Sequence, residues 1–175
     1  WKTIPDHLFT CDVTAPFELK HHQRPARFDA VTSWELIEHI KADDLPAVCR
    51  NVLAHLAPGG IWIMSVSTDH EVINGQVLHQ TVQPEKWWLK MFKGQGLTHH
   101  PHLAAYFESD WVRGPLQGAP GSFHLVLSRA DDPASIQVAE QHGFGLVDIR
   151  VTFEHLMKNW PDPNLAAPRG GIDDR

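Results

Sequence analysis

The chain of 175 residues has few cysteines, no long apolar segment and no excess of basic residues. Two cysteines, Cys11 and Cys49, are too few for a disulfide framework, and we expect both to be buried free thiols. No apolar run is long enough to span a membrane and no signal peptide is visible, so we expect a cytoplasmic location. The net charge of −6 gives no general attraction to phosphate backbones, which disfavours nucleic-acid partners and favours small molecules or glycans.

The residues that are present suffice for one globular domain, with 42% hydrophobic and 21% charged side chains. The run FDAVTSW at 28–34 is rich in β-branched and aromatic residues, which predicts a strand. Apolar residues recur at helical spacing over 45–56 and stop before Gly59-Gly60, and a second strand-like run follows at 61–67. This order predicts two parallel strands joined by a helix, with ligands bound at their carboxyl ends.

Three patterns in this order resemble the middle of a class I S-adenosylmethionine-dependent methyltransferase. They are Asp12-Val13 after a short strand at 7–11, the strand FDAVTSW with its turn ELIEH, and the helix ending LAPGG before the strand IWIMSVS. The resemblance covers about residues 8–129. It implies a Rossmann-like α/β sheet, mostly parallel with an antiparallel end.

The glycine-rich loop that holds the methionine end of the cofactor in this family has no counterpart in the chain. Gly94-Gln95-Gly96 and Gly143-Phe144-Gly145 are the G-x-G runs, and each is typical of a turn after a helix. We therefore expect the family's first strands to precede Trp1, so that residues 1–129 form the C-terminal part of a methyltransferase domain. Beyond it, residues 130–160 are expected to add a helix and a strand, and 161–175 to form a flexible tail.

The resemblance assigns the cofactor to residues at the strand ends. Asp12 would accept a hydrogen bond from the adenine amino group, and the N–H of Val13 would reach a ring nitrogen. The alternative for Asp12 is that it caps a turn, as aspartate often does after a strand. Ser33, Trp34 and Glu35 would form the wall beside the sulfonium and the adenosine.

The E-x-x-E-H turn at 35–39 has three interpretations. Glu35 and Glu38 could complement the dipole at a helix start, without any ligand. The turn could instead form part of the cofactor wall. In the third interpretation Glu35, Glu38 and His39 hold a metal ion together with His79. This resembles small-RNA 2′-hydroxyl methyltransferases and some ubiquinone-pathway O-methyltransferases, and the oxygen-rich set suits Mg²⁺ or Mn²⁺ while a histidine admits softer ions.

His79 is also the candidate general base, because a neutral imidazole can take the proton of a hydroxyl that attacks the methyl group. A structural or metal-binding role is the alternative. The other candidate histidines are His70, His99, His100 and His102.

Downstream, the pattern predicts a helix over 84–92, a strand region over 97–107, a loop over 108–122 and a strand over 123–128. The function that the resemblance implies is transfer of a methyl group from S-adenosylmethionine to an oxygen or nitrogen of a small molecule or sugar. The alternatives are a non-catalytic scaffold that binds a partner protein, and a divalent-metal-dependent hydrolase or RNA 2′-O-methyltransferase that uses the E-x-x-E-H set.

Overall fold

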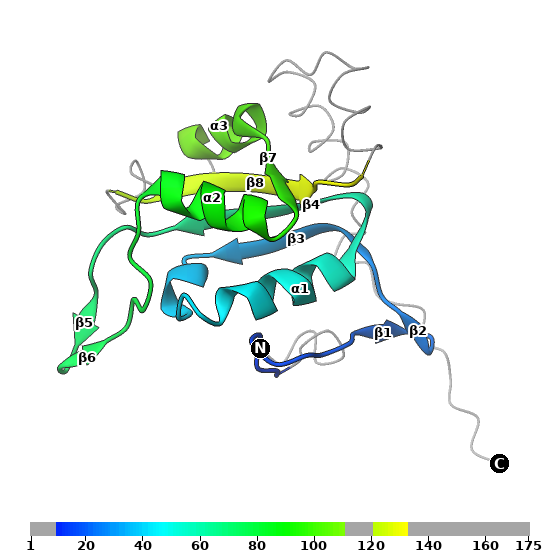
Figure 1. Cartoon of the computed structure of the whole chain (residues 1–175), viewed down its shortest axis with the longest axis horizontal. Helices are drawn as coiled ribbons and strands as arrows, with labels where there is room; N and C mark the ends of the chain where they lie inside the picture. The colour runs from blue at the N-terminus through cyan, green and yellow to red at the C-terminus, as the bar shows by residue number, and fades with distance from the viewer. Residues whose placement is uncertain (1–9, 111–120, 133–175) are drawn as a thin grey trace, which may run out of the picture. The chain divides into compact units, whose positions relative to one another are not determined.

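The computed structural model describes residues 10–110 and 121–132, and for 106–110 it describes the backbone alone (Figure 1). They form a four-stranded sheet in the order β3-β4-β8-β7 and two separate two-stranded ribbons. None of the described helices is long and apolar enough to cross a membrane. Most of the predicted extension, the tail and the second G-x-G run lie outside these residues.

The predicted strand–helix–strand unit is confirmed as β3 (Phe28–Trp34), α1 (Leu45–His55) and β4 (Leu56–Val66). β3 and β4 pair in parallel, and their register shifts between Phe28 and Ala30. Gly60 lies at this irregularity, where a Cβ atom would come within 2.8 Å of the Phe28 carbonyl oxygen. β4 therefore begins earlier than predicted, because glycine lets the two backbones approach closely before the regular ladder starts.

The far side of the sheet is antiparallel, as the resemblance implies. β8 (Phe123–Arg129) pairs antiparallel with β4 on one side and with β7 (Leu97–His99) on the other. The expectation of a mostly parallel sheet is wrong for the described strands, since only one of its three pairings is parallel. The described sheet is small and mixed because the chain reverses direction after β4.

The predicted strand region over 97–107 is wrong beyond His99, because α3 (Pro101–Asp110) follows at once. Proline has no N–H for a strand ladder, whereas the first position of a helix requires none. The predicted helix over 84–92 is confirmed as α2 (Glu85–Gly94). Gly96 follows it with φ +79°, so the first G-x-G run is a turn after a helix, as predicted.

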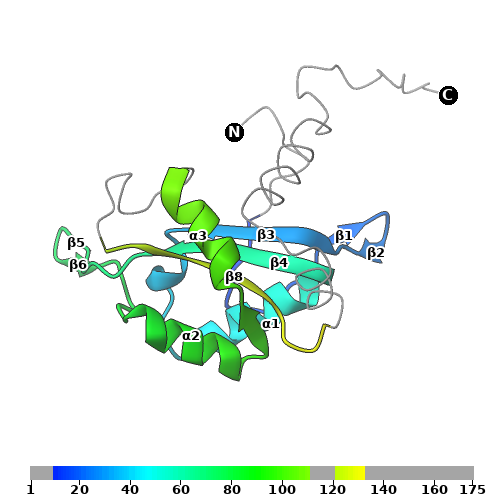
Figure 2. The ribbon, with the colours of Figure 1, turned by 90° about the horizontal axis from the view of Figure 1, so that it is seen from above.

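The helices cover both faces of the sheet. Figure 2 shows α1 and α2 on one face and α3 on the other, and strand alternation gives each face its own buried cluster. Trp62 and Met64 of β4 pack on the side of α1 and α2, while Ile63 packs with Ala104 of α3. Two short ribbons and one helical turn complete the described chain: β1 (Lys20–His21) with β2 (Arg24–Pro25), β5 (Val72–Ile73) with β6 (Gln76–Val77), and η2 (Ile37–His39).

The two cysteines differ in environment. Cys49 of α1 is buried, as expected, and burial raises the pKa of its thiol to about 12. Cys11 is exposed and lies outside any strand, so the expectation of a buried thiol there is wrong. The described part of the predicted strand at 7–11 is irregular backbone instead.

Candidate functional site

The site is built where β3 and β4 end side by side. Glu35, directly after β3, has φ +47°, a conformation that is uncommon for residues other than glycine. Its N–H donates a hydrogen bond of 2.9 Å to Ser65 Oγ of β4, which helps to hold this turn. The sharp turn sends the chain into η2 and so brings Glu38 and His39 to the end of β4.

Glu38 is fully buried beneath the end of β4, with 0% of its surface exposed. Its Oε1 accepts a hydrogen bond of 3.0 Å from the N–H of Ser67. Its Oε2 is buried and has no hydrogen-bond partner among the described residues. Burial raises the pKa of Glu38, and the charge of Glu35 adds to this, while the Ser67 N–H and His79 oppose it. A buried carboxylate with one unused oxygen is costly unless a cation meets it.

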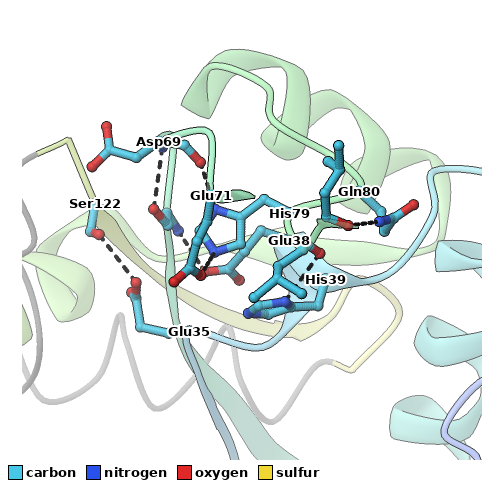
Figure 3. Close-up of polar contacts among 11 residues, drawn as sticks. Glu35, Glu38, His39, Asp69, Glu71, His79, Gln80 and Ser122 are labelled. Atoms are coloured by element: carbon cyan, nitrogen blue, oxygen red, sulfur yellow. Dashed lines mark hydrogen bonds and ion pairs between the residues drawn. The ribbon is translucent and has the colours of Figure 1, made fainter. Parts of the chain in front are cut away.

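The histidines His39 and His79 lie beside Glu38 with their rings 4.7 Å apart (Figure 3). His39 Nδ1 is 3.2 Å from the carbonyl oxygen of Leu78, and His79 Nδ1 is 2.5 Å from that of Asp69. A carbonyl oxygen only accepts, so each Nδ1 carries the hydrogen. When the rings are neutral, both Nε2 atoms therefore have a free lone pair, the arrangement found in metal-ligating histidines.

His79 Nε2 has a further partner, Glu71 Oε2, at 3.2 Å. His79 is 8% exposed, while the Glu71 side chain is 46% exposed. A neutral Nε2 and a carboxylate oxygen are both acceptors, so the two atoms attract each other only when a proton or a metal ion lies between or beside them. The pair is therefore arranged to stabilise a proton that His79 takes up, or a metal ion.

The structure brings together three of the four predicted metal ligands. One ligand atom from each of Glu38, His39 and His79 lies within 4.8 Å of the other two, and this is the one such group found in the described part of the chain. Glu35, the fourth, does not join it. Its Oε2 is 3.4 Å from Oγ of Ser122, the residue before β8, and its Oε1 is buried without a partner among the described residues.

The predicted cofactor wall, Ser33, Trp34 and Glu35, lies at the same end of the sheet, but Ser33 and Trp34 already contact other side chains of the protein. Ser33 is 7% exposed, and its Oγ accepts a hydrogen bond of 3.0 Å from the indole N–H of Trp62. Trp34 is half-buried, with its ring 6.3 Å from that of His124. Ser33 therefore helps to hold the core beneath the wall.

Asp12 caps a turn, as the alternative interpretation predicted. Its Oδ1 accepts hydrogen bonds from the Oγ of Thr14 at 2.7 Å and from the N–H of Thr14 at 2.9 Å. These two bonds lower the pKa of Asp12 below its ordinary value. Val13 is half-buried and packs against the main core cluster. The turn presents an ionised carboxylate, and the adenine contact of Asp12 and Val13 stays a prediction.

The other candidate histidines lie apart from the cluster. His70 is exposed, His99 ends β7, His100 lies between β7 and α3, and His102 is in the first turn of α3. His100 Nε2 is 2.8 Å from Ser128 Oγ, and burial, together with the charges of His102 and His99, lowers its pKa.

Sequence reasoning missed the hairpin that carries His79. Asn74 and Gly75, with φ of 52° and 78°, form its turn, and Asn-Gly is the usual sequence for such a two-residue turn. Glu71 precedes β5, and the N–H of Leu78 after β6 bonds the Glu71 carbonyl oxygen at 2.9 Å. The hairpin thereby places Glu71 beside His79. It extends away from the four-stranded sheet, with three exposed apolar side chains, Val72, Ile73 and Val77 (Figure 1).

Comparison with known proteins agrees with this architecture. Residues 4–109, more than half of the chain, match the family model described as a methyltransferase domain. The chain therefore belongs to the methyltransferase domain family, which confirms the resemblance and implies S-adenosylmethionine as the cofactor. Comparison with curated proteins gives no match.

Solved structures give low global similarity. A DhpI complex with SAH is 16% identical, with a TM-score of 0.44 and coverage of 61% of this chain and 49% of that one. The glycopeptide N-methyltransferase MtfA is 14% identical, with a TM-score of 0.45 and coverage of 68% and 59%. An O-methyltransferase family protein from Burkholderia thailandensis is 14% identical, with a TM-score of 0.41 and coverage of 60% and 31%. The chain thus spans less than two thirds of each of these three proteins, and no residue assignment here rests on them.

Proposed function

We propose that this domain transfers a methyl group from S-adenosylmethionine to an oxygen or nitrogen of a small molecule or sugar. Membership of the methyltransferase domain family carries this conclusion, and the polar edge at the ends of β3 and β4 supports it. When bound, S-adenosylmethionine supplies an electrophilic methyl group on a sulfonium. The protein's task is then to align the acceptor in line with that methyl group and to remove a proton from it.

On the cofactor side, Asp12 and Val13 are the proposed adenine contacts. The lowered pKa of Asp12 keeps its carboxylate ionised, which suits an acceptor for an amino group. Glu35 and Trp34 form the proposed wall beyond β3. The buried, unpartnered Oε1 of Glu35 is available there to a polar group of the cofactor or the acceptor.

On the acceptor side, we propose His79 as the general base. Its Nδ1–H is fixed by the Asp69 carbonyl, so Nε2 is the atom that takes the proton. The Glu71 carboxylate, 3.2 Å away, then stabilises the imidazolium that results.

We propose a second role for the same cluster, as a divalent-cation site made by Glu38 Oε2 and the Nε2 atoms of His39 and His79. The fixed Nδ1–H donors and the unpartnered buried oxygen support this role. Two imidazole nitrogens and one oxygen suit Mn²⁺ or Zn²⁺ better than Mg²⁺, which prefers oxygen ligands. In this arrangement His79 is a ligand and not the base, and the ion would order the acceptor end of the site.

Calorimetric titration of S-adenosylhomocysteine into the whole protein tests these roles, with chelator and with Mn²⁺ or Zn²⁺. We expect binding under both conditions, and binding that Asp12→Asn weakens about tenfold, the scale of a lost charge-assisted hydrogen bond. Asp43→Asn, which also neutralises an exposed aspartate, is the matched control and should bind normally.

Absence of binding would support the non-catalytic scaffold instead. A metal-dependent hydrolysis that ignores S-adenosylmethionine would support the hydrolase alternative, and methylation of RNA 2′-hydroxyls alone would support the RNA methyltransferase.

A further inference from the structure

Helix α1 carries two buried polar side chains one turn apart, Asn51 and His55, which are 9% and 5% exposed. A buried amide or imidazole destabilises a fold unless it is hydrogen-bonded. Both are bonded here to backbone outside the helix, and His55 is also bonded to α1 itself. Neither was singled out from the sequence, because a polar residue on a helix gives no sign of which segment it meets.

Both side chains bind the irregular segment that follows Asp12. Asn51 Nδ2 donates to the carbonyl oxygens of Val13 and Ala15, each at 2.8 Å. His55 Nε2 accepts the N–H of Leu19 at 3.0 Å, and its Nδ1 donates to the Asn51 carbonyl oxygen at 2.7 Å. His55 is therefore held as the neutral tautomer with hydrogen on Nδ1. The ring of Phe17 stacks on it with centroids 4.9 Å apart.

The bonds of Asn51 fix one peptide plane in particular. The peptide between Val13 and Thr14 is held at its carbonyl by Asn51 and at its N–H by Asp12 Oδ1. The Asp12 carboxylate is thereby anchored through one oxygen to a plane that α1 holds in place. Ala15 N–H closes the turn onto the Asp12 carbonyl oxygen at 3.1 Å.

Within the described residues, no hydrogen bond of normal geometry is found for the second oxygen of Asp12 or for the N–H of Val13, although the nearby N–H of Ala15 also stabilises the Asp12 carboxylate as an anion. One accepts and one donates, and they are adjacent in the chain. An adenine ring presents the complementary pair, an amino group that donates beside a ring nitrogen that accepts. The hydrogen bonds from Asn51 of α1 therefore fix the geometry of a hydrogen-bond acceptor and donor that together fit this edge of adenine.

We infer that Asn51 and His55 are positioning residues for recognition of the adenine edge of the cofactor. They act through the Asp12–Ala15 turn and touch neither the cofactor nor the acceptor. This role rests on the proposed function, since it requires Asp12 and Val13 to contact the adenine.

The test compares two ligands by calorimetry, S-adenosylhomocysteine and its inosine analogue, in which oxygen replaces the adenine amino group. The wild-type protein should prefer the adenosine form by about tenfold or more, the scale of one charge-assisted hydrogen bond. Asn51→Leu should lose most of this preference while kcat at saturating S-adenosylmethionine stays near normal. Val48→Ala, a core truncation on the same helix, is the matched control and should lower Tm without changing the preference.

His55→Phe keeps a ring against Phe17 but removes the acceptor for Leu19, so it tests the same role if Asn51→Leu does not fold. It should also reduce the preference for the adenosine ligand, but by less than Asn51→Leu does, because His55 bonds Leu19, which is further along the chain from Asp12 than the Val13 and Ala15 that Asn51 bonds. A folded Asn51→Leu or His55→Phe with the full wild-type preference would overturn the positioning role and leave the proposed function standing. A wild-type protein that binds neither ligand would overturn both.

Discussion

Because the carboxylate of Glu38 is buried, we predict that Glu38→Gln raises the thermal stability of the protein without a divalent cation and lowers it when the cation is bound. The folded-state pKa of Glu38 is raised, so the fold favours the protonated acid. The associated stability is present below the unfolded pKa of about 4.3 and is lost as pH rises through the raised folded value. Above that raised value the wild-type protein carries the cost of a buried charge, and a neutral glutamine removes it.

The magnitude follows from the burial of Glu38, which is 0% exposed with one oxygen unpartnered. Removing the charge should stabilise the cation-free protein by about 1 kcal/mol, because the glutamine amide is itself only partly satisfied. For a chain of this size that raises Tm by about 2–4 °C. A cation at 100 times its Kd would instead stabilise the wild-type protein by about 2.7 kcal/mol, or about 5–10 °C.

The assay is thermal unfolding followed by circular dichroism at pH 8, in chelator and then in Mn²⁺ or Zn²⁺. We expect Glu38→Gln to melt above the wild type in chelator and below it in the cation. The two proteins should converge near pH 4 in chelator, where the wild-type acid is protonated. Glu18→Gln is the matched control, because this exposed carboxylate only pairs with Lys20 and contributes little.

Two results would refute the reasoning. If Glu38→Gln melts below the wild type in chelator at pH 8, the buried carboxylate is not a cost to the fold. If the cation raises both Tm values equally, Glu38 is not a ligand.

Two further predictions concern the core. Gly60→Ala should lower the free energy of unfolding in urea by about 2–3 kcal/mol, since its Cβ would lie 2.8 Å from the Phe28 carbonyl oxygen. Gly94→Ala is the control and should not destabilise the fold, because a Cβ at Gly94 meets open space. Equal effects of the two substitutions would contradict the close approach at Gly60. In a thiol-titration assay, the exposed Cys11 should react at once. Cys49, which is buried and has a pKa of about 12, should react only after the protein unfolds. Two rapidly reacting thiols in the folded protein would show that Cys49 is accessible.

Periodicity and composition predicted the elements that form the framework of the site. α1, β4, α2 and β8 were found because each buries apolar residues at a regular spacing, whereas β3, which is largely exposed, was found from its β-branched and aromatic composition. α3 was missed because the apolar residues of its region fit either a strand or a helix. Only the rigid ring of Pro101, which starts a helix and cannot join a strand ladder, decides between them.

The candidate site was predicted less completely. Glu38, His39 and His79 were grouped in advance, together with Glu35, by the resemblance of the E-x-x-E-H turn and a later histidine to metal-dependent methyltransferases. The separation of Glu35 from them depends on one backbone angle, φ +47°, which the sequence does not reveal. Contacts between distant segments, such as Asn51 with Val13, were likewise invisible because no spacing rule links them.

The β5–β6 hairpin leaves the domain and returns to it at a single backbone pair, Glu71 with Leu78, 2.9 Å apart. Chain inserted at its tip, between Asn74 and Gly75, would not disturb that pair or the strands of the sheet, and lengthening such a loop costs little free energy. The tip is thus a place where added residues should leave the fold of the sheet and the ends of β3 and β4 unchanged.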